Sequence, residues 1–244
     1  YYVGDGNDVI VGFSENDSIH VAAEKYTAAV SGSDVILNID GGSITLKNAA
    51  GKVSNVRAIL KKGTDSADNI TNADNDFIID AGGGNDTVSN SGGNVSVSGG
   101  AGNDSINNSG QYSTLDGGAG DDTIRNSGGQ SVLDGGAGND LIYNENGYAT
   151  ISGGDGNDSI NAYNYAGIID GGAGDDKITL RSGSSENTVR GGSGNDTIHV
   201  ENYSSYGVVY QYGAGDGSDL ITGFGTKDTL QITSGSFTTL QSGS

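Results

Sequence analysis

The sequence predicts an all-β protein in which the chain winds into a parallel β-solenoid, and three features of its repeat indicate this fold. A glycine-rich turn ending in Asp returns every 18 residues, an aliphatic residue follows each turn by two positions, and a second aliphatic row keeps the same period. A fixed short period is typical of solenoids, in which each repeat forms one coil that stacks on the next. No part of the repeat region has a helical period or helix caps, so we expect almost no helix.

The turns set the period of the solenoid. Their consensus is Gly-Gly-Ala-Gly-Asn/Asp-Asp, and the final Asp advances by 18 residues six times and by 20 residues once. We call the nine positions that start at the first Gly places one to nine, so this Asp stands at place six. Gly supplies the positive-φ positions of such turns and lets the backbones pack closely. The place-six residues are Asp68, Asp86, Asp104, Asp122, Asp140, Asp158, Asp176 and Asp196.

Two aliphatic rows run in step with the turns. The first row stands at place eight and contains Ile70, Val88, Ile106, Ile124, Ile142, Ile160, Ile178 and Ile198. The second row contains Ile79, Val97, Leu115, Leu133, Ile151, Ile169, Val189 and Val209. Alternate residues of a strand face opposite sides, so one inward residue per short strand gives two facing rows. We therefore expect a flattened solenoid of two sheets with a thin core that needs further stabilisation.

The chain divides into four segments by composition and rhythm. Two alternating segments flank Gly41-Gly42 within the part that lacks the 18-residue rhythm, which predicts a β-hairpin there. We expect residues 1–13 to end a preceding solenoid block, 14–62 to form a small β-rich module with this hairpin, 63–224 to form the main solenoid, and 225–244 to be the truncated start of a next small module.

A second and much longer repeat relates the two ends of the chain. Gly4, Asp5, Gly6, Asp8, Ile10, Gly12, Phe13 and Asp17 recur 211 positions later as Gly215, Asp216, Gly217, Asp219, Ile221, Gly223, Phe224 and Asp228. Thr27, Ser31, Gly32 and Ser33 recur with the same offset as Thr238, Ser242, Gly243 and Ser244. The chain also has no Met. We therefore expect a piece of a longer tandem array.

Composition excludes several classes of function. The 31 acidic and 11 basic residues give a net charge of −20, which repels nucleic acid and anionic lipid. No apolar run has the length of a membrane span. There is no Cys, and neither the two His nor the Ser residues stand in a pattern typical of a hydrolytic triad. We expect no enzymatic activity, no nucleic-acid partner and no membrane span.

One carboxylate per coil at a constant phase builds a column of negative charge. Calcium takes six to eight oxygen ligands in flexible geometry, and glycine-rich turns expose carbonyl oxygens beside the carboxylates. Magnesium demands stricter octahedral geometry, and zinc prefers His or Cys. About seven ions would offset most of the charge of −20. The alternative is a metal-free solenoid in which the turns are solvated corners.

The turns are similar to a known calcium-binding repeat. Residues 117–125 and 135–143 match the nonapeptide Gly-Gly-x-Gly-x-Asp-x-aliphatic-x at every place. This nonapeptide resembles that of the RTX (repeat-in-toxin, haemolysin-type) family over residues 63–224 and again over 4–10. The resemblance implies a right-handed parallel β-roll, Ca²⁺ held between stacked turns, and folding that waits for extracellular calcium.

The resemblance also implies which atoms hold calcium. Side chains would come from place six, and also from Asp8 and Asp219 outside the regular series. Carbonyl oxygens would come from places one, three and five: Gly99, Ala101, Asn103, Gly117, Ala119, Asp121, Gly135, Ala137, Asn139, Gly153, Asp155, Asn157, Gly171, Ala173, Asp175, Gly191, Ser193 and Asn195. The copy that starts at Gly63 lacks three glycines and is a weak site. The nine residues that follow place nine complete the coil, and we call them its second nine. The motif is missing from every second nine, which predicts one row of ions along one edge.

The opposite edge has its own regularities. Asn72, Asn90, Asn108, Asn126 and Asn144 stand in register there and can form a hydrogen-bonded ladder. Several tyrosines also fall in the second nines: Tyr112, Tyr148, Tyr163, Tyr165, Tyr203 and Tyr206. They would either pack over the turns or form a contact surface for a glycan or a protein chain.

These features favour a calcium-stabilised structural segment of a large secreted or bacterial cell-surface protein, such as an adhesin or an S-layer-like protein. Its partners would include neighbouring copies of its own tandem repeat. The alternative is the calcium-dependent folding and export module of an RTX toxin or exoenzyme. The offset of 211 residues favours the first reading. A third option is an ice-binding roll, which would require an outward Thr at place three, but this place mostly holds Ala here.

Overall fold

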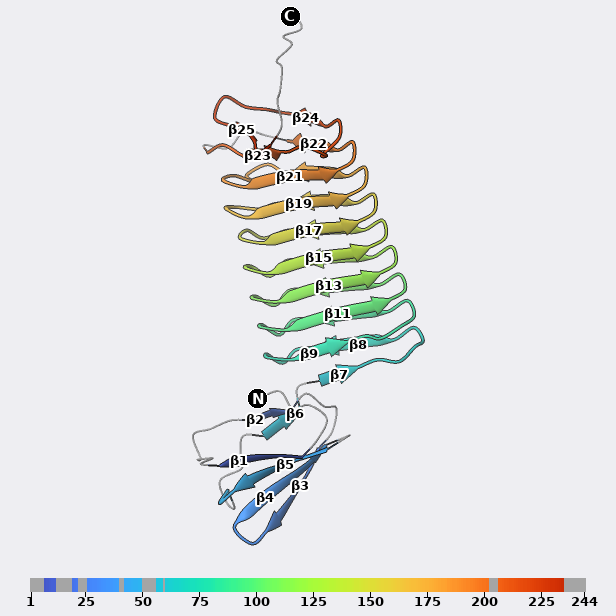
Figure 1. Ribbon diagram of the computed structural model, residues 1–244, viewed down its shortest axis with the longest axis vertical. Helices are drawn as coiled ribbons and strands as arrows, with labels where there is room; N and C mark the ends of the chain where they lie inside the picture. The colour runs from blue at the N-terminus through green and yellow to red at the C-terminus, as the bar shows by residue number, and fades with distance from the viewer. Residues whose placement is uncertain are drawn as a thin grey trace, which may run out of the picture.

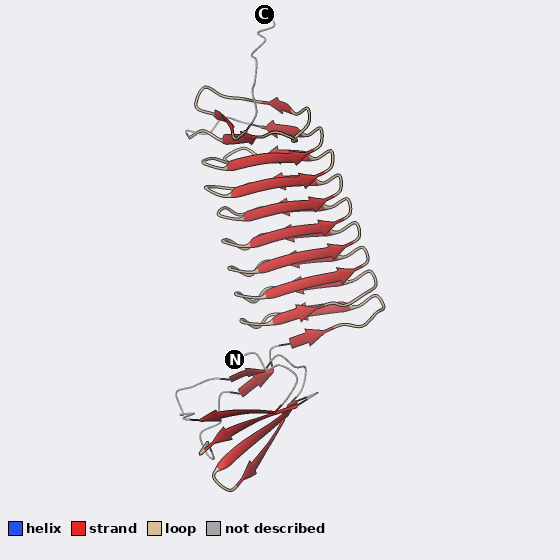
Figure 2. Ribbon diagram, in the orientation of Figure 1, coloured by secondary structure: helices blue, strands red, loops and turns tan. Residues whose placement is uncertain are grey.

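The computed structural model describes residues 7–11, 19–21, 26–39, 42–49, 56–58, 60–201 and 206–234. Within these ranges the chain forms twenty-five strands and no helix (Figure 2). It follows that no described segment offers the long apolar helix that a membrane span requires. The prediction of an all-β parallel solenoid with coils about 18 residues apart is confirmed.

Two long parallel sheets make up the solenoid, and their strands lie one above another like rungs (Figure 1). The nine-stranded sheet contains β8 (Asn69–Asn72), β10 (Thr87–Asn90), β12 (Ser105–Asn108), β14 (Thr123–Asn126), β16 (Leu141–Asn144), β18 (Ser159–Ala162), β20 (Lys177–Leu180), β22 (Thr197–Val200) and β24 (Leu220–Thr222). The ten-stranded sheet contains β7 (Leu60–Lys62), β9 (Ile78–Asp80), β11 (Ser96–Ala101), β13 (Thr114–Ala119), β15 (Val132–Ala137), β17 (Thr150–Asp155), β19 (Ile168–Ala173), β21 (Thr188–Ser193), β23 (Val209–Tyr212) and β25 (Thr229–Ile232).

Each coil gives one strand to each sheet, and the register equals the sequence period. Ile106 lies beside Ile124 in one sheet, and Leu115 lies beside Leu133 in the other. Equivalent residues of successive coils therefore form straight columns. As a result, any property that recurs at one place of the repeat becomes a line along the solenoid.

The core consists of the two predicted aliphatic rows. Residues such as Ile124, Leu133 and Ile142 are fully buried between the sheets. The prediction fails at the last residue of the second row. Tyr210, not Val209, lies beside Val189 and points into the core, while Val209 lies beside Thr188 on the outward face. The coil between Val189 and Tyr210 is 21 residues long, so the insertion shifts the inward position by one residue relative to the expected count.

The N-terminal residues form two small sheets. The four-stranded sheet has the order β1 (Asn7–Val11), β5 (Gly42–Lys47), β4 (Asp34–Ile39) and β3 (Tyr26–Ser31), and the two-stranded sheet pairs β2 (Ile19–Val21) with β6 (Val56–Ala58). The predicted hairpin is confirmed, because β4 and β5 are antiparallel and Ile39 lies opposite Gly42. The alternation of buried and less buried residues along β5 explains why this segment reads as a strand.

Strand pairing at the expected domain borders is continuous. The strand β7 begins the ten-stranded sheet just before residue 63, and β25 extends that sheet beyond residue 224. The strand β1, which was expected to end a preceding solenoid block, pairs here in parallel with β5 of the small module. The division into domains itself stays a prediction.

The burial of the aliphatic rows makes a first prediction. Ile142→Ala removes a fully buried side chain in mid-solenoid and should destabilise the chain by about 2–5 kcal/mol, since the stacked coils cannot close the cavity. The control Val132→Ala changes an outward side chain that is 46% exposed, and should cost less than about 1 kcal/mol. Denaturant unfolding in calcium-containing buffer measures both. Equal losses would show that the rows do not form the core.

Candidate metal centre

The turns that follow the long strands lie along one edge of the solenoid, which we call the first edge. In the turn between β11 and β12, Gly100 has a φ of 103° and Gly102 a φ of 121°, and each other regular turn repeats these two left-handed residues. Side chains with a Cβ rarely adopt this conformation, which explains why places two and four hold Gly. The two reversals bring the place-six Asp back towards the turn that it closes.

The place-six side chains form a continuous hydrogen-bonded column. The Oδ1 atom of each Asp accepts a hydrogen bond from the backbone N–H of the Asp one coil earlier. The N–H of Asp104 donates to Oδ1 of Asp122 over 2.6 Å, and the N–H of Asp122 donates to Oδ1 of Asp140 over 2.7 Å. The same bond recurs from Asp68 to Asp219. These bonds fix the carboxylate plane in each coil.

The second oxygen of each carboxylate has no partner. The Oδ2 atoms of seven aspartates are buried without a hydrogen bond, and the residues are only 1–3% exposed. They are Asp86, Asp104, Asp122, Asp140, Asp158, Asp176 and Asp196. A buried acceptor without a donor is costly, and a buried unpaired charge costs more. The same hydrogen-bond donor is therefore missing in seven successive coils, so its absence is a feature of the repeat and not of one coil.

A backbone carbonyl faces the same gap as the free carboxylate oxygen. A methyl group built on Gly99 would overlap both Oδ2 of Asp104 and the carbonyl oxygen of Gly117 in the next coil. Corresponding overlaps recur at Gly117, Gly135, Gly153 and Gly171. The two oxygens therefore converge on one small space, and a side chain at place one would fill it. This is the physical reason for Gly at place one.

Burial and mutual repulsion raise the pKa of these carboxyl groups. The pKa of Asp122 rises to about 7, first because of burial and then because of neighbouring carboxylates such as Asp140. The pKa of Asp176 also rises to about 7, and those of Asp140 and Asp219 rise to about 6, with burial again the largest cause. Asp104, Asp158 and Asp196 are raised in the same way. The bare column therefore favours binding positive charge, either protons or a cation.

The oxygens that converge at each gap fit a hard divalent cation. In the described part of the chain, no three side chains of Asp, Glu, His or Cys converge at one point. Each gap instead brings together one carboxylate oxygen and one carbonyl oxygen, and such oxygen ligands suit calcium, whereas zinc prefers His or Cys. The place-six Asp and the place-one carbonyl of the next coil would hold the ion.

The structure places the other expected ligands in different roles. Place-three carbonyls accept hydrogen bonds between coils, as when Gly102 N–H donates to the Ala119 oxygen over 2.7 Å, so only one lone pair of each stays free. The carboxylate of Asp68 accepts hydrogen bonds from the N–H and hydroxyl of Thr64, and so it differs from the seven others. Asp219 continues the column, and the side chain of Asp8 lies outside the described part.

Sequence reasoning missed the role of the place-five side chains. It assigned only their carbonyl oxygens, but Oδ1 of Asn103 accepts a hydrogen bond from the N–H of Asp121 over 3.0 Å. Oδ1 of Asp121 in turn accepts from the N–H of Asn139 over 2.8 Å, and the ladder runs from Asn85 to Asn195. Only Asn and Asp present an oxygen at this distance from the backbone. Their exclusive use at place five of the regular turns was the available signal.

The opposite edge, which we call the second edge, is lined by a column of buried, uncharged Asn side chains. The predicted Asn ladder is confirmed: Nδ2 of Asn90 donates to Oδ1 of Asn108 over 2.7 Å, and Asn108 donates to Asn126 in the same way. Each of these amides also donates to a carbonyl of its own turn, as Asn108 does to Gly110 over 2.8 Å. This edge therefore has no counterpart of the orphaned carboxylates.

The tyrosines expected on the second edge lie there where the structure describes them. Tyr112, Tyr148, Tyr163 and Tyr206 are exposed, and Tyr148 packs edge-to-face on Tyr165 with ring centroids 5.4 Å apart. Tyr112 and Tyr148 have positive φ angles of 57° and 62°. Tyr203 lies outside the described residues. Binding of a glycan or protein by this group stays a prediction.

Comparison with known proteins bears directly on the first edge. The family described as RTX calcium-binding nonapeptide repeat (4 copies) matches residues 2–23, 80–115, 98–133, 116–151, 152–185 and 181–202. Together these segments cover more than half of the chain. None of the curated proteins matches the chain.

The crowding at place one makes a second prediction. In Gly117→Ala the new Cβ would lie 2.6 Å from Oδ2 of Asp122 and overlap the Gly135 oxygen, so the variant should lose about 1–3 kcal/mol and bind calcium less tightly. Gly129→Ala on the second edge is the matched control, because its nearest neighbour atom would be 3.7 Å away. Unfolding and calcium titration measure both variants. Two equally stable variants would contradict the proposed gap.

The raised pKa values make a third prediction, for the calcium-free chain. A carboxyl group whose pKa is higher in the folded state than its usual 3.8 stabilises the fold fully at a pH below 3.8. This contribution is lost as the pH rises through the folded pKa, which is about 6 to 7 for these groups. Without calcium, the β-sheet signal in circular dichroism should therefore grow as the pH falls from about 8 to about 4. With calcium bound the trend should reverse, because protons displace the ion. A calcium-free chain that loses structure on acidification would contradict this assignment.

Proposed function

Because the chain belongs to the RTX calcium-binding nonapeptide repeat family, we propose that it is a calcium-stabilised structural segment of a large secreted or cell-surface protein. The observation that carries this proposal is the column of seven buried carboxylates, each with one oxygen satisfied by the neighbouring coil and one oxygen without a partner. Such a column is unstable as bare charge and regular enough to serve as a row of identical sites.

Calcium, when bound, supplies two positive charges and takes six to eight oxygen ligands. The chain provides what such an ion needs at the first edge. The Oδ1 bond to the preceding coil fixes each carboxylate, as between Asp104 and Asp122, so that Oδ2 stays directed at the gap. Gly at place one keeps the gap open, and the carbonyl of the next coil completes the link between coils. One ion per gap would thus join two coils.

The distribution of charge supports a single row of ions. The buried residues at the second edge are amides such as Asn108 and Asn126, which satisfy one another and require no cation. The first edge concentrates buried carboxylates at equal spacing, and their repulsion grows as coils stack. Folding would therefore be coupled to calcium, since the ion offsets a charge that exists only when the coils are in register.

A structural role, rather than catalysis, follows from the uses that the side chains already have. The Asp and Asn columns link coil to coil, and their bonds run along the axis of the solenoid. A rigid rod of this kind suits spacing and lateral contact in an extracellular adhesin or S-layer-like protein. Folding and export of a toxin or exoenzyme is the alternative, and the recurrence of sequence after 211 residues favours the rod.

The proposal predicts calcium-dependent folding. By circular dichroism, the chain at neutral pH should be largely unstructured in chelator and rich in β-structure in calcium at millimolar concentration. The physical reason is that the buried carboxylates of the first edge repel one another until a cation binds. Magnesium at the same concentration is the control for ionic strength and should restore much less structure. Equal β-sheet content with and without calcium would refute the proposal.

A single carboxylate tests the ligand role. Asp122→Asn keeps the Oδ1 acceptor and the shape of the side chain but removes the charge, so the calcium affinity of the adjoining gaps should fall about tenfold or more. Asp74→Asn is the matched control, because Asp74 is exposed at the second edge. Calorimetric titration gives the affinity and the number of ions for each variant. If both variants bind calcium like the parent chain, Asp122 is not a ligand.

A further inference from the structure

The last coil of the solenoid has a counterpart near the N-terminus. The offset of 211 residues that relates Phe13 to Phe224 and Asp17 to Asp228 also relates Ile19 to Leu230. With this offset β24 corresponds to the last three residues of β1, and β25 corresponds to β2 with one residue before it. The chain therefore contains two copies of one coil. The N-terminal copy contributes β1 and β2, and the C-terminal copy contributes β24 and β25.

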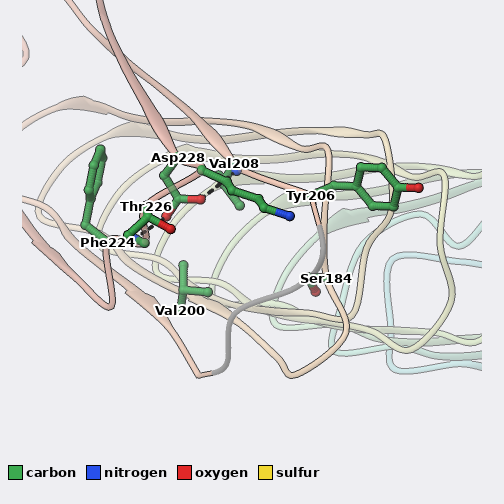
Figure 3. A pocket seen from close by; sticks show the side chains of 9 residues that line it. Ser184, Val200, Tyr206, Val208, Phe224, Thr226 and Asp228 are labelled. Atoms are coloured by element: carbon green, nitrogen blue, oxygen red, sulfur yellow. Dashed lines mark hydrogen bonds between the residues drawn. The ribbon is translucent and has the colours of Figure 1, made fainter.

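The C-terminal copy is docked on the solenoid that precedes it. The strands β24 and β25 extend the two sheets by pairing in parallel with β22 and β23. The residues that recur at the long offset make this contact. The Phe224 ring packs on Tyr210 with centroids 5.4 Å apart. Asp228 accepts hydrogen bonds from the N–H groups of Val208 and Gly225 over 2.9 and 2.7 Å, as the dashed lines in Figure 3 show.

The N-terminal copy is docked on the module that follows it. The strand β1 pairs in parallel with β5, and β2 pairs in parallel with β6. The two copies thus have different partners: the C-terminal copy contacts the coil before it, and the N-terminal copy contacts the module after it. All four pairings are parallel, as a continuous solenoid requires.

The burial of equivalent residues differs between the copies. Ile19 is 2% exposed, whereas Leu230, its counterpart in β25, is 49% exposed although it stands in the same column as the core residue Tyr210. An inward leucine that is half exposed lacks one covering layer. In the N-terminal copy, β6 pairs with the strand that carries Ile19, and no equivalent of β6 follows β25 within residues 1–244.

We propose that the terminal coil is a shared junction, which pairs with the solenoid before it through β22 and β23 and with a following copy of residues 26–58 through the equivalents of β5 and β6. The occupant of the open end of the solenoid is thus the small module of the next tandem copy.

The geometry of β-sheets permits both pairings at once. A strand has two hydrogen-bonding edges, and β1, β24 and β25 each stand at the end of their sheet, where no further strand pairs with them among the residues that the structure describes. When both pairings are present, each solenoid sheet continues into the next module, and successive units form one rod without a flexible linker. Open strand edges invite uncontrolled association, so a dedicated partner for them also protects the array.

Thiol labelling tests the junction. The chain has no Cys, so Leu230→Cys introduces a single thiol. The rate at which this thiol reacts is compared between two proteins, both in calcium-containing buffer. One is the 244-residue chain, and the other is the same chain extended by a second copy of the sequence. The added copy starts at Asp34, because Ser244 corresponds to Ser33 at the offset of 211 residues. The maleimide reaction should be about tenfold or more slower in the extended chain, because its module would cover the thiol as it covers Ile19. Equal rates would overturn the proposal.

Further variants keep the test decisive. Val132→Cys, on the outward face in mid-solenoid, should react at the same rate in both proteins and so controls for the reactivity of an exposed thiol, whereas Ile142→Cys at a fully buried position should stay protected in both and so reports that the extended chain is folded. Ile19→Cys should already be protected in the 244-residue chain, and if it reacts as fast as Val132→Cys the proposal is overturned. In the folded extended chain, a disulfide between Leu220→Cys and Thr45→Cys of the added copy is an independent test, since Leu220 corresponds to Val9, and Val9 and Thr45 are register partners. Its absence under oxidising conditions counts against the junction.

The inference does not depend on the calcium assignment. Labelling reports on the end of the solenoid, whereas calcium-dependent folding is read from circular dichroism of the same proteins. An unprotected Leu230→Cys in a chain that still folds on calcium addition would remove the junction and leave the proposed function in place.

Discussion

The rest of the structure depends on the stacking of one carboxylate per coil at the same point of the first edge. Parallel register places Asp104, Asp122 and Asp140 directly in line, and each accepts a hydrogen bond from the backbone of the coil before it. The same stacking buries a second oxygen that no donor reaches. Stacking ionised coils therefore creates a line of negative charge, which a bound cation or protonation would offset. The calcium dependence that we propose would thus arise from the register of the coils.

The polar side chains of the two edges form their hydrogen bonds in different ways. At the second edge each Asn amide offers both a donor and an acceptor, so the Nδ2 group of each Asn from Asn72 to Asn126 donates to Oδ1 of the next Asn in the column. At the first edge an ionised carboxylate only accepts, so its column needs an external partner. On the proposed function, the second edge would hold together without a ligand and the first edge would respond to calcium. The core between the two edges is a thin layer of aliphatic side chains, so that response would affect the whole solenoid.

The regularity also indicates where the tandem array that we propose would be joined. In mid-solenoid every coil is covered by its neighbours, so residues such as Leu133 are fully buried. At the end the same column exposes Leu230, and the recurrence of the terminal coil near the N-terminus points to what covers it. A protein that grows by adding coils needs such a junction, because an open sheet edge would otherwise pair with any strand.

The sequence by itself determined the period, the two apolar rows, the turn chemistry and the Asp and Asn columns. These follow from local rules: strand alternation, the left-handed conformation of Gly, and the fact that a fixed repeat places equal residues in line. Other features were decided only by the tertiary structure. Tyr210 replaced Val209 in the core because the length of a coil, and not the local pattern, sets the inward position. The side chain of Asn103 acts between coils because a neighbour 18 residues away presents its N–H there. The free oxygen of Asp122 and the different partners of β1 and β24 likewise depend on contacts distant in sequence, which a local pattern does not contain.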